Sequence, residues 1–161
     1  MQTVTVPMES LAEIILLQLN TGGRANLTVT GSSMLPMLHN RQDSVTLIPA
    51  DGKQKKGDVI LYRRENGRYI LHRIIAADRE GYTCCGDNQA EKEPVSREQV
   101  IAVVDGFTRK GKVYTVDAPI YRLYTAVWVN LFVLRRYYIK LRRRLGRLRR
   151  KKLTNNRRIR K

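Results

Sequence analysis

A chain of 161 residues with 42% hydrophobic residues can bury the core of one domain, and is too short for several. Its formal net charge of +17 is uneven, because residues 120–161 hold 16 of the 31 Lys and Arg and none of the 14 Asp and Glu. The two cysteines, Cys84 and Cys85, are too close in sequence for an unstrained disulfide, and no Cys/His set is spaced for zinc. These features imply no metal or cofactor. The basic segment is expected to meet a polyanion, either an acidic lipid surface or nucleic acid.

The first segment, residues 1–24, is predicted to contain a short amphipathic helix from Met8 to Leu19. Glu9 and Glu13 lie where a secretory leader would be positively charged, and the apolar run is shorter than the ~20 residues that span a bilayer. We therefore expect neither a signal peptide nor a full transmembrane span.

Residues 25–118 contain short runs of Val, Ile, Leu, Tyr and Thr separated by Gly, Asn and Asp, a pattern typical of β-strands. Glu65-Asn66-Gly67 lies between two such runs, and Asn-Gly there is a strong hairpin signal. The segment is predicted to be the main domain, a mainly β fold with a small bent antiparallel sheet or barrel. The expected strands are residues 26–30, 44–48, 59–64, 68–76, 82–85, 100–104 and 113–116.

Residues 119–153 are predicted to form a long basic amphipathic helix that begins at Pro119. Its most apolar part, Leu123 to Leu134, rises about 18 Å, which is less than the ~30 Å hydrocarbon core of a bilayer. The pattern indicates a helix lying in the membrane interface, so we expect a peripheral membrane protein on the cytoplasmic face. The alternative is that Tyr121 to Leu134 folds back on the β domain, and residues 154–161 are expected to be disordered. The expected membrane-binding residues are Trp128, Arg135, Arg136, Arg142, Arg143 and Arg144.

Two serines precede a stiff apolar turn at Gly31-Ser32-Ser33-Met34-Leu35-Pro36. The preceding alternation from Asn26 to Thr30 indicates a strand that ends at Gly31 and presents the serines at its tip. Pro36 restricts its own φ angle and the conformation of the residue before it. A hydroxyl fixed in this way can act as a nucleophile when a base lies nearby.

Four segments resemble, in order and spacing, the sequence boxes of type I signal peptidases. Ser33 opens a Ser-Met-x-Pro box, which carries the nucleophile in that family. His72 stands where bacterial members have a lysine base and where endoplasmic-reticulum, archaeal and some Gram-positive members have histidine. The resemblance covers roughly residues 28–104 and implies a serine endopeptidase that cleaves signal or other precursor peptides after small residues. The boxes are Ser33-Met34-Leu35-Pro36, Gly57 to Arg63, Tyr69 to Ile75, and Gly86-Asp87-Asn88.

The resemblance and the residue chemistry together assign a candidate site. Ser33 is expected to attack the scissile carbonyl while the neutral imidazole of His72 accepts its proton. Asp87 is the first candidate for the acid that orients His72, and Glu91 and Glu93 remain alternatives.

Backbone N–H groups at the Ser33 turn are expected to hold the oxyanion, with Ser32 or Thr30 as a possible hydroxyl donor. This chain has Gly31 where the bacterial type has a serine, so the side-chain donor is open. The resemblance also implies a shallow pocket for small side chains. Its expected lining residues are Met34, Leu35, Pro36, Ile70 and Ile74.

A second function remains open from the sequence. A lone histidine on an apolar strand face is usually a core residue, so the β domain would then be non-catalytic. Its basic helix would bind nucleic acid or an anionic membrane, although the apolar segment from Leu123 to Leu134 is not needed for binding duplex nucleic acid.

Overall fold

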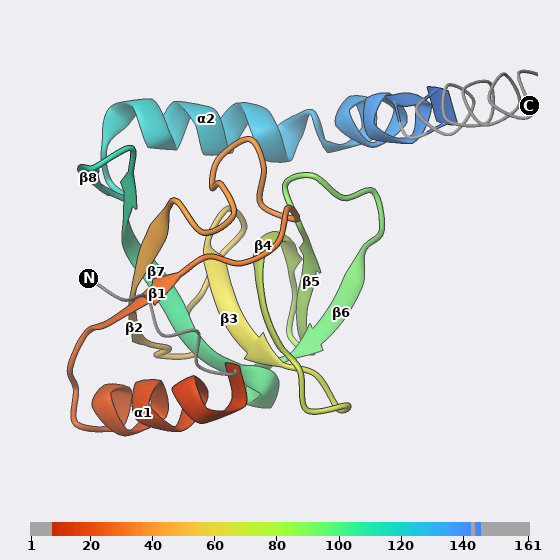
Figure 1. Ribbon diagram of the computed structural model, residues 1–161. Coiled ribbons are helices and arrows are strands. Elements are labelled where there is room, and N and C mark those ends of the chain that lie inside the picture. The colour runs from red at the N-terminus through yellow and green to blue at the C-terminus, as the bar shows by residue number, and fades with distance from the viewer. Residues whose placement is uncertain (1–7, 143, 146–161) are drawn as a thin grey trace, which may run out of the picture.

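A computed structural model of the protein describes residues 8–142 and 144–145 (Figure 1). Eight antiparallel strands form one curled sheet, which confirms the predicted mainly β fold with a bent antiparallel sheet. The strand order is β1-β2-β7-β3-β4-β5-β6, and β8 pairs with β7. The strands are β1 (Ala25–Thr28), β2 (Ser44–Pro49), β3 (Val59–Arg63), β4 (Tyr69–Ala77), β5 (Gly81–Cys85), β6 (Glu93–Ser96), β7 (Val100–Arg109) and β8 (Lys112–Thr115).

The β3–β4 hairpin sets the register around the candidate base. Its turn contains Gly67 at φ 81°, a conformation that glycine adopts without steric cost. The register pairs Ile60 with His72 and Tyr62 with Ile70. Tyr62 is two residues from Ile60, so it lies on the same face of the sheet as His72 and is its diagonal neighbour.

Strand β6 was not predicted. It contains Pro94, which cannot donate a backbone hydrogen bond and so argues against a central strand. The structure resolves this conflict by placing β6 at the edge of the sheet, where it pairs with β5 alone.

Two apolar clusters form most of the core. The larger one lies between the sheet and the helix α1 (Met8–Asn20), which contributes Ile15 and Leu19. The smaller one lies on the other face of β3 and β4 and contains Tyr62, Ile74 and Cys84. Cys84 and Cys85 are free and buried, and burial raises the pKa of both thiols.

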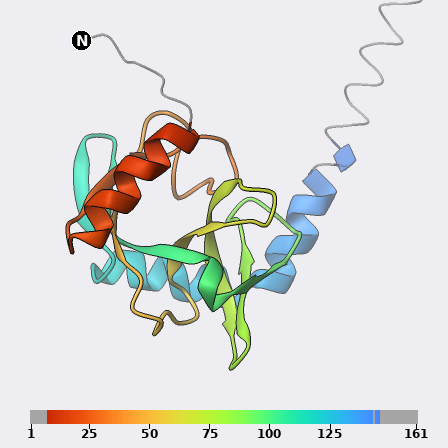
Figure 2. The same cartoon turned by 90° about the horizontal axis from the view of Figure 1, so that it is seen from below.

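Helix α1 and the later helix α2 (Pro119–Asn130) lie at opposite ends of the curled sheet (Figures 1 and 2). Helix α2 begins at its proline, as predicted, and residues 132–142 and 144–145 are also helical. Leu131 breaks the helix between these parts, where one uninterrupted helix was expected. The expected helix end at 153 and the segment 154–161 lie outside the described residues. Among the described residues, no helix is both long and apolar enough to cross a bilayer.

Candidate active site

The serine turn follows β1 and is fixed at both ends. Gly31 has a φ of 86°, and its N–H donates to Asn40 Oδ1 over 2.8 Å. Met34 anchors the other end, because its side chain is only 1% exposed. Ser32 is exposed and Ser33 is half-buried, so the two hydroxyls occupy different environments.

The loop after β5 holds this turn from the opposite side. The Asn88 N–H donates to the Ser33 carbonyl oxygen over 2.7 Å, and Asn88 Nδ2 donates to the Ser32 carbonyl oxygen over 3.1 Å. A Cβ at Gly86 would lie 2.8 Å from the Ser33 carbonyl oxygen and 3.1 Å from His72 Nε2. Glycine therefore allows the serine turn and the imidazole to approach the same point.

His72 lies on β4 with 3% of its surface exposed. Its Nδ1 is 3.2 Å from the Tyr62 hydroxyl oxygen, and that hydroxyl donates to Glu93 Oε2 over 2.9 Å. Because the Tyr62 hydroxyl donates its hydrogen to Glu93, the Tyr62 oxygen accepts a hydrogen bond from His72 Nδ1–H. This series of hydrogen bonds places the imidazole proton on Nδ1 and leaves the lone pair on Nε2. The Nε2 atom faces Gly86.

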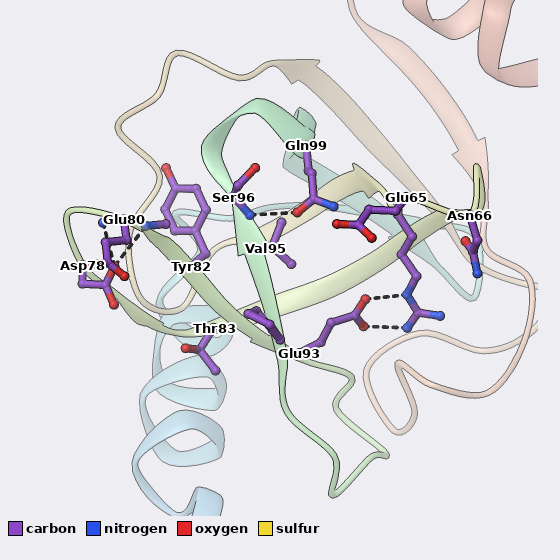
Figure 3. Close-up of a pocket in the computed structure, with 13 residues that line it drawn as sticks. Glu65, Asn66, Asp78, Glu80, Tyr82, Thr83, Glu93, Val95, Ser96 and Gln99 are labelled. Atoms are coloured by element: carbon purple, nitrogen blue, oxygen red, sulfur yellow. Dashed lines mark hydrogen bonds and ion pairs between the residues drawn. The ribbon is translucent and has the colours of Figure 1, made fainter.

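Glu93 is fixed by an ion pair with Arg64, shown as dashed lines in Figure 3. Burial opposes ionisation, but the Arg64 guanidinium and the Tyr62 hydroxyl together lower the pKa of Glu93. Burial also lowers the pKa of His72 to about 4, against a smaller opposing effect of Glu93. The imidazole is therefore neutral at physiological pH.

Asp87 forms no hydrogen bond with His72, and its charge raises the pKa of His72 less than that of Glu93 does. Its two carboxylate oxygens accept from Arg73 Nε over 2.9 Å and from Arg73 Nη2 over 2.8 Å, and both side chains are fully buried. Tyr124 also donates its hydroxyl to Asp87, and Trp128 Nε1 donates to the Asp87 carbonyl oxygen. The structure thus gives Asp87 the role of tying the loop after β5 to α2. Of the two alternative acids, Glu91 accepts from the Ala90 N–H, whereas Glu93 reaches His72 through Tyr62.

Ser33 and His72 line the same small cavity of about 200 Å³. Thr30, Met34 and Ile70, which were also expected near the site, line this cavity as well. A larger hollow of about 640 Å³ lies beyond the Arg64–Glu93 pair and contains neither Ser33 nor His72 (Figure 3).

Three of the expected pocket residues do not line the cavity. Ile74 is fully buried in the smaller core cluster, on the same face of β4 as His72 but farther along the strand. Pro36 is exposed and Leu35 is half-buried on the far part of the turn. Ser32, one of the two expected hydroxyl donors, is also absent from the cavity wall.

Two of the expected membrane-binding residues face the domain instead. Trp128 donates to the loop at Asp87, and Arg135 is 7% exposed, with its guanidinium over the rings of Trp128 and Phe132. They were placed on the wrong face because the sequence does not show which side of the helix meets the sheet. Of the others, Arg136 and Arg144 are exposed, Arg142 donates to Asn88 Oδ1, and Arg143 lies outside the described residues.

Sequence reasoning missed the role of Tyr62, and it named Glu93 only as an alternative. The hairpin signal at Glu65-Asn66-Gly67 could have found Tyr62, because the register it sets makes Tyr62 the diagonal neighbour of His72. The described residues contain no group of three or more His, Cys, Asp or Glu side chains able to hold a metal ion.

Comparisons of this chain with protein-family models, curated proteins and solved structures found no match.

Proposed function

We propose that this protein is a serine endopeptidase, similar in its residues to type I signal peptidases, with Ser33 as nucleophile and His72 as general base. The observation that carries the proposal is that Ser33 and His72 line one cavity, and that Gly86 lies close to both the Ser33 carbonyl oxygen and His72 Nε2. A core histidine satisfied on both nitrogens would have no lone pair free to accept a proton.

In the proposed reaction, Ser33 Oγ forms a bond to the scissile carbonyl carbon as its proton passes to His72 Nε2. The protonated imidazole then gives that proton to the leaving amine, and the C–N bond breaks to leave an ester on Ser33. Water attacks the ester with His72 again as base, which releases the acid product and restores the serine. Tyr62 and Glu93 hold the reactive tautomer, and they stabilise the positive charge that develops on the imidazole.

The cavity supports a preference for small side chains. About 200 Å³ must hold both backbone and side-chain atoms of the substrate, and Met34 and Ile70 make part of the wall apolar. Edge strand β1 borders the cavity, so an extended peptide can pair with its free backbone groups. Thr30 is the better placed of the two candidate hydroxyl donors to the oxyanion, because it lines the cavity and Ser32 does not.

The experiment is incubation of the full chain with a precursor that carries an Ala-x-Ala site, with the products identified by mass spectrometry. We expect one cut after the second alanine, lost in Ser33→Ala and in His72→Ala. Ser32→Ala is the matched control and should keep the activity. Cleavage that survives Ser33→Ala would overturn the assignment, and failure of the wild-type protein to cut would favour the non-catalytic β domain.

A further inference from the structure

The C-terminal helical arm, defined as α2 together with residues 132–145, leaves one long apolar face uncovered. We call this face the outer stripe. Its members recur every three or four residues and are each 45–73% exposed, although all are large apolar or aromatic side chains. They are Ile120, Leu123, Val127, Leu131, Leu134, Tyr138, Leu141 and Leu145.

The opposite face of the arm already packs against the β domain. This inner face is buried, with side chains that are only 3–7% exposed: Tyr121, Val129, Phe132 and Ile139. The apolar surface that the domain presents to the arm is therefore already covered by the inner face. The outer stripe is therefore additional to the core, and it is larger than the scattered apolar residues of an ordinary surface. It runs for roughly 40 Å along the arm.

Positive charge lies beside the outer stripe. Arg122, Arg136, Lys140 and Arg144 are exposed on the same arm, and the sequence has no acidic residue after Asp117. At the start of the arm, a hollow of about 430 Å³ lies between α2 and the turn joining β7 and β8. That hollow is lined on its helix side by Ile120 and Tyr124 and on its hairpin side by Arg109, Lys110 and Lys112. A partner must be apolar along the stripe and negative beside it.

These two requirements decide which kind of partner can cover the outer stripe. A second copy of the arm would bring two basic surfaces together, and like charges repel. Duplex nucleic acid supplies the negative charge but gains nothing from eight exposed apolar side chains. An anionic lipid bilayer offers acyl chains to the stripe and headgroups to the flanking arginines and lysines.

We propose that the outer stripe seats this protein in the interface of an anionic lipid bilayer, with the arm lying along the membrane surface. This assigns lipid contact to Leu123, Leu134 and their neighbours, whereas Trp128 and Arg135 hold the arm to the domain. The proposal does not rest on peptidase activity, since lipid binding is measured without a peptide substrate.

The test is flotation of the full chain with phosphatidylcholine vesicles prepared with and without phosphatidylglycerol. Wild-type protein should float with the phosphatidylglycerol vesicles and bind much more weakly to phosphatidylcholine alone. Replacing Leu123 and Leu134 together by serine should weaken binding by about tenfold per leucine. Leu17→Ser is the matched control, because Leu17 is 70% exposed on α1 at the far end of the sheet.

The charge requirement is tested with Arg136→Gln and Lys140→Gln, each expected to weaken binding to the anionic vesicles by about fivefold. Arg79→Gln, at an exposed position in the β4–β5 turn, is the control. All these variants should melt at the wild-type temperature, because the replaced side chains are exposed.

Three results would overturn the proposal. One is flotation that the leucine substitutions leave unchanged. Another is a self-association in solution that the same substitutions abolish, which would make a second copy the occupant. The third is duplex DNA binding that falls with the leucine substitutions while vesicle binding is absent.

Discussion

Replacing Tyr62 by phenylalanine removes one oxygen atom from the chain that joins His72 to Glu93. The ring remains to fill the core, where Tyr62 is fully buried. His72 Nδ1 then loses its 3.2 Å partner while 97% of the histidine surface stays buried. Glu93 keeps its ion pair with Arg64, so the unsatisfied group is the imidazole.

The size of the effect follows from that unsatisfied group. A buried polar group without a partner costs about 1–3 kcal/mol. The Nδ1–H tautomer loses this stabilisation, and with it the lone pair on Nε2 that the mechanism uses. In the proposed reaction the same loss appears in kcat/KM, which we expect to fall roughly ten- to a hundredfold.

The assay is cleavage of the Ala-x-Ala precursor by wild-type protein, by Tyr62→Phe and by Tyr82→Phe as a matched control. Tyr82 belongs to the same apolar cluster and also uses its hydroxyl in hydrogen bonds, but none of them involves His72. Wild-type kcat/KM in Tyr62→Phe, or an equal loss in Tyr82→Phe, would refute the role of Tyr62 in positioning the base.

Three further predictions concern the loop after β5 and the state of the base. Gly86→Ala would push on the Ser33 carbonyl oxygen at 2.8 Å, so we expect about a hundredfold loss of activity and 1–3 kcal/mol of destabilisation. Since burial lowers the pKa of His72 to about 4, kcat/KM should rise as pH increases through about 4 and stay level across pH 6.5. Asp87→Asn leaves the buried Arg73 without its counter-ion, so Tm should fall by roughly 10 °C, measured by calorimetry.

Each of these predictions has a control or a contradicting result. Gly81→Ala also places a Cβ too close to backbone, 2.5 Å from the Val95 carbonyl oxygen, and should destabilise the fold without lowering kcat. An activity midpoint near pH 6.5 would contradict the buried neutral imidazole. If Asp87→Asn shifted that midpoint while Tm stayed constant, Asp87 would act on His72 after all.

The lowered pKa of His72 also predicts how the stability of the fold depends on pH. Between pH 6.5 and about 4, the unfolded chain binds a proton at this imidazole and the folded protein does not. The free energy of unfolding should therefore decrease as pH falls through this window, by at most about 3 kcal/mol. His72→Gln should show less of this decrease in urea titrations, and an equal decrease in both proteins would contradict the low pKa.

The sheet was predictable because its signals are local. Alternating apolar residues and the Asn-Gly turn at residue 67 define the β3–β4 hairpin and its register without knowledge of the rest of the chain. Strand β6 was missed because Pro94 weakens the local signal, and only its place at the sheet edge makes that residue tolerable.

The partners of the site residues were less predictable, because they depend on how distant elements pack. Ser33 and His72 were named from their local sequence, but the choice of Glu93 over Asp87 needs the arrangement of β3, β4 and β6. Asp87 meets Arg73 because that arginine points to the opposite face of β4 from His72.

Amphipathic spacing predicted a helix from Pro119 onward but not which apolar side meets the domain. Both faces of the arm carry large apolar residues, with Phe132 on the inner face and Leu134 on the outer face. Hydrophobic periodicity alone cannot rank two such faces, whereas the hydrogen bond from Trp128 to the loop at Asp87 identifies the inner one.

The most direct test of the central claim is whether an acyl group forms on Ser33 under the control of His72. The full chain is mixed with a p-nitrophenyl ester of an Ala-x-Ala peptide, quenched in acid, and mapped by mass spectrometry. We predict that the acyl group is found on Ser33 in wild-type protein and in Ser32→Ala, and is lost in His72→Ala. An acyl group on another residue, or equal acylation of Ser33 without His72, would contradict the proposed mechanism.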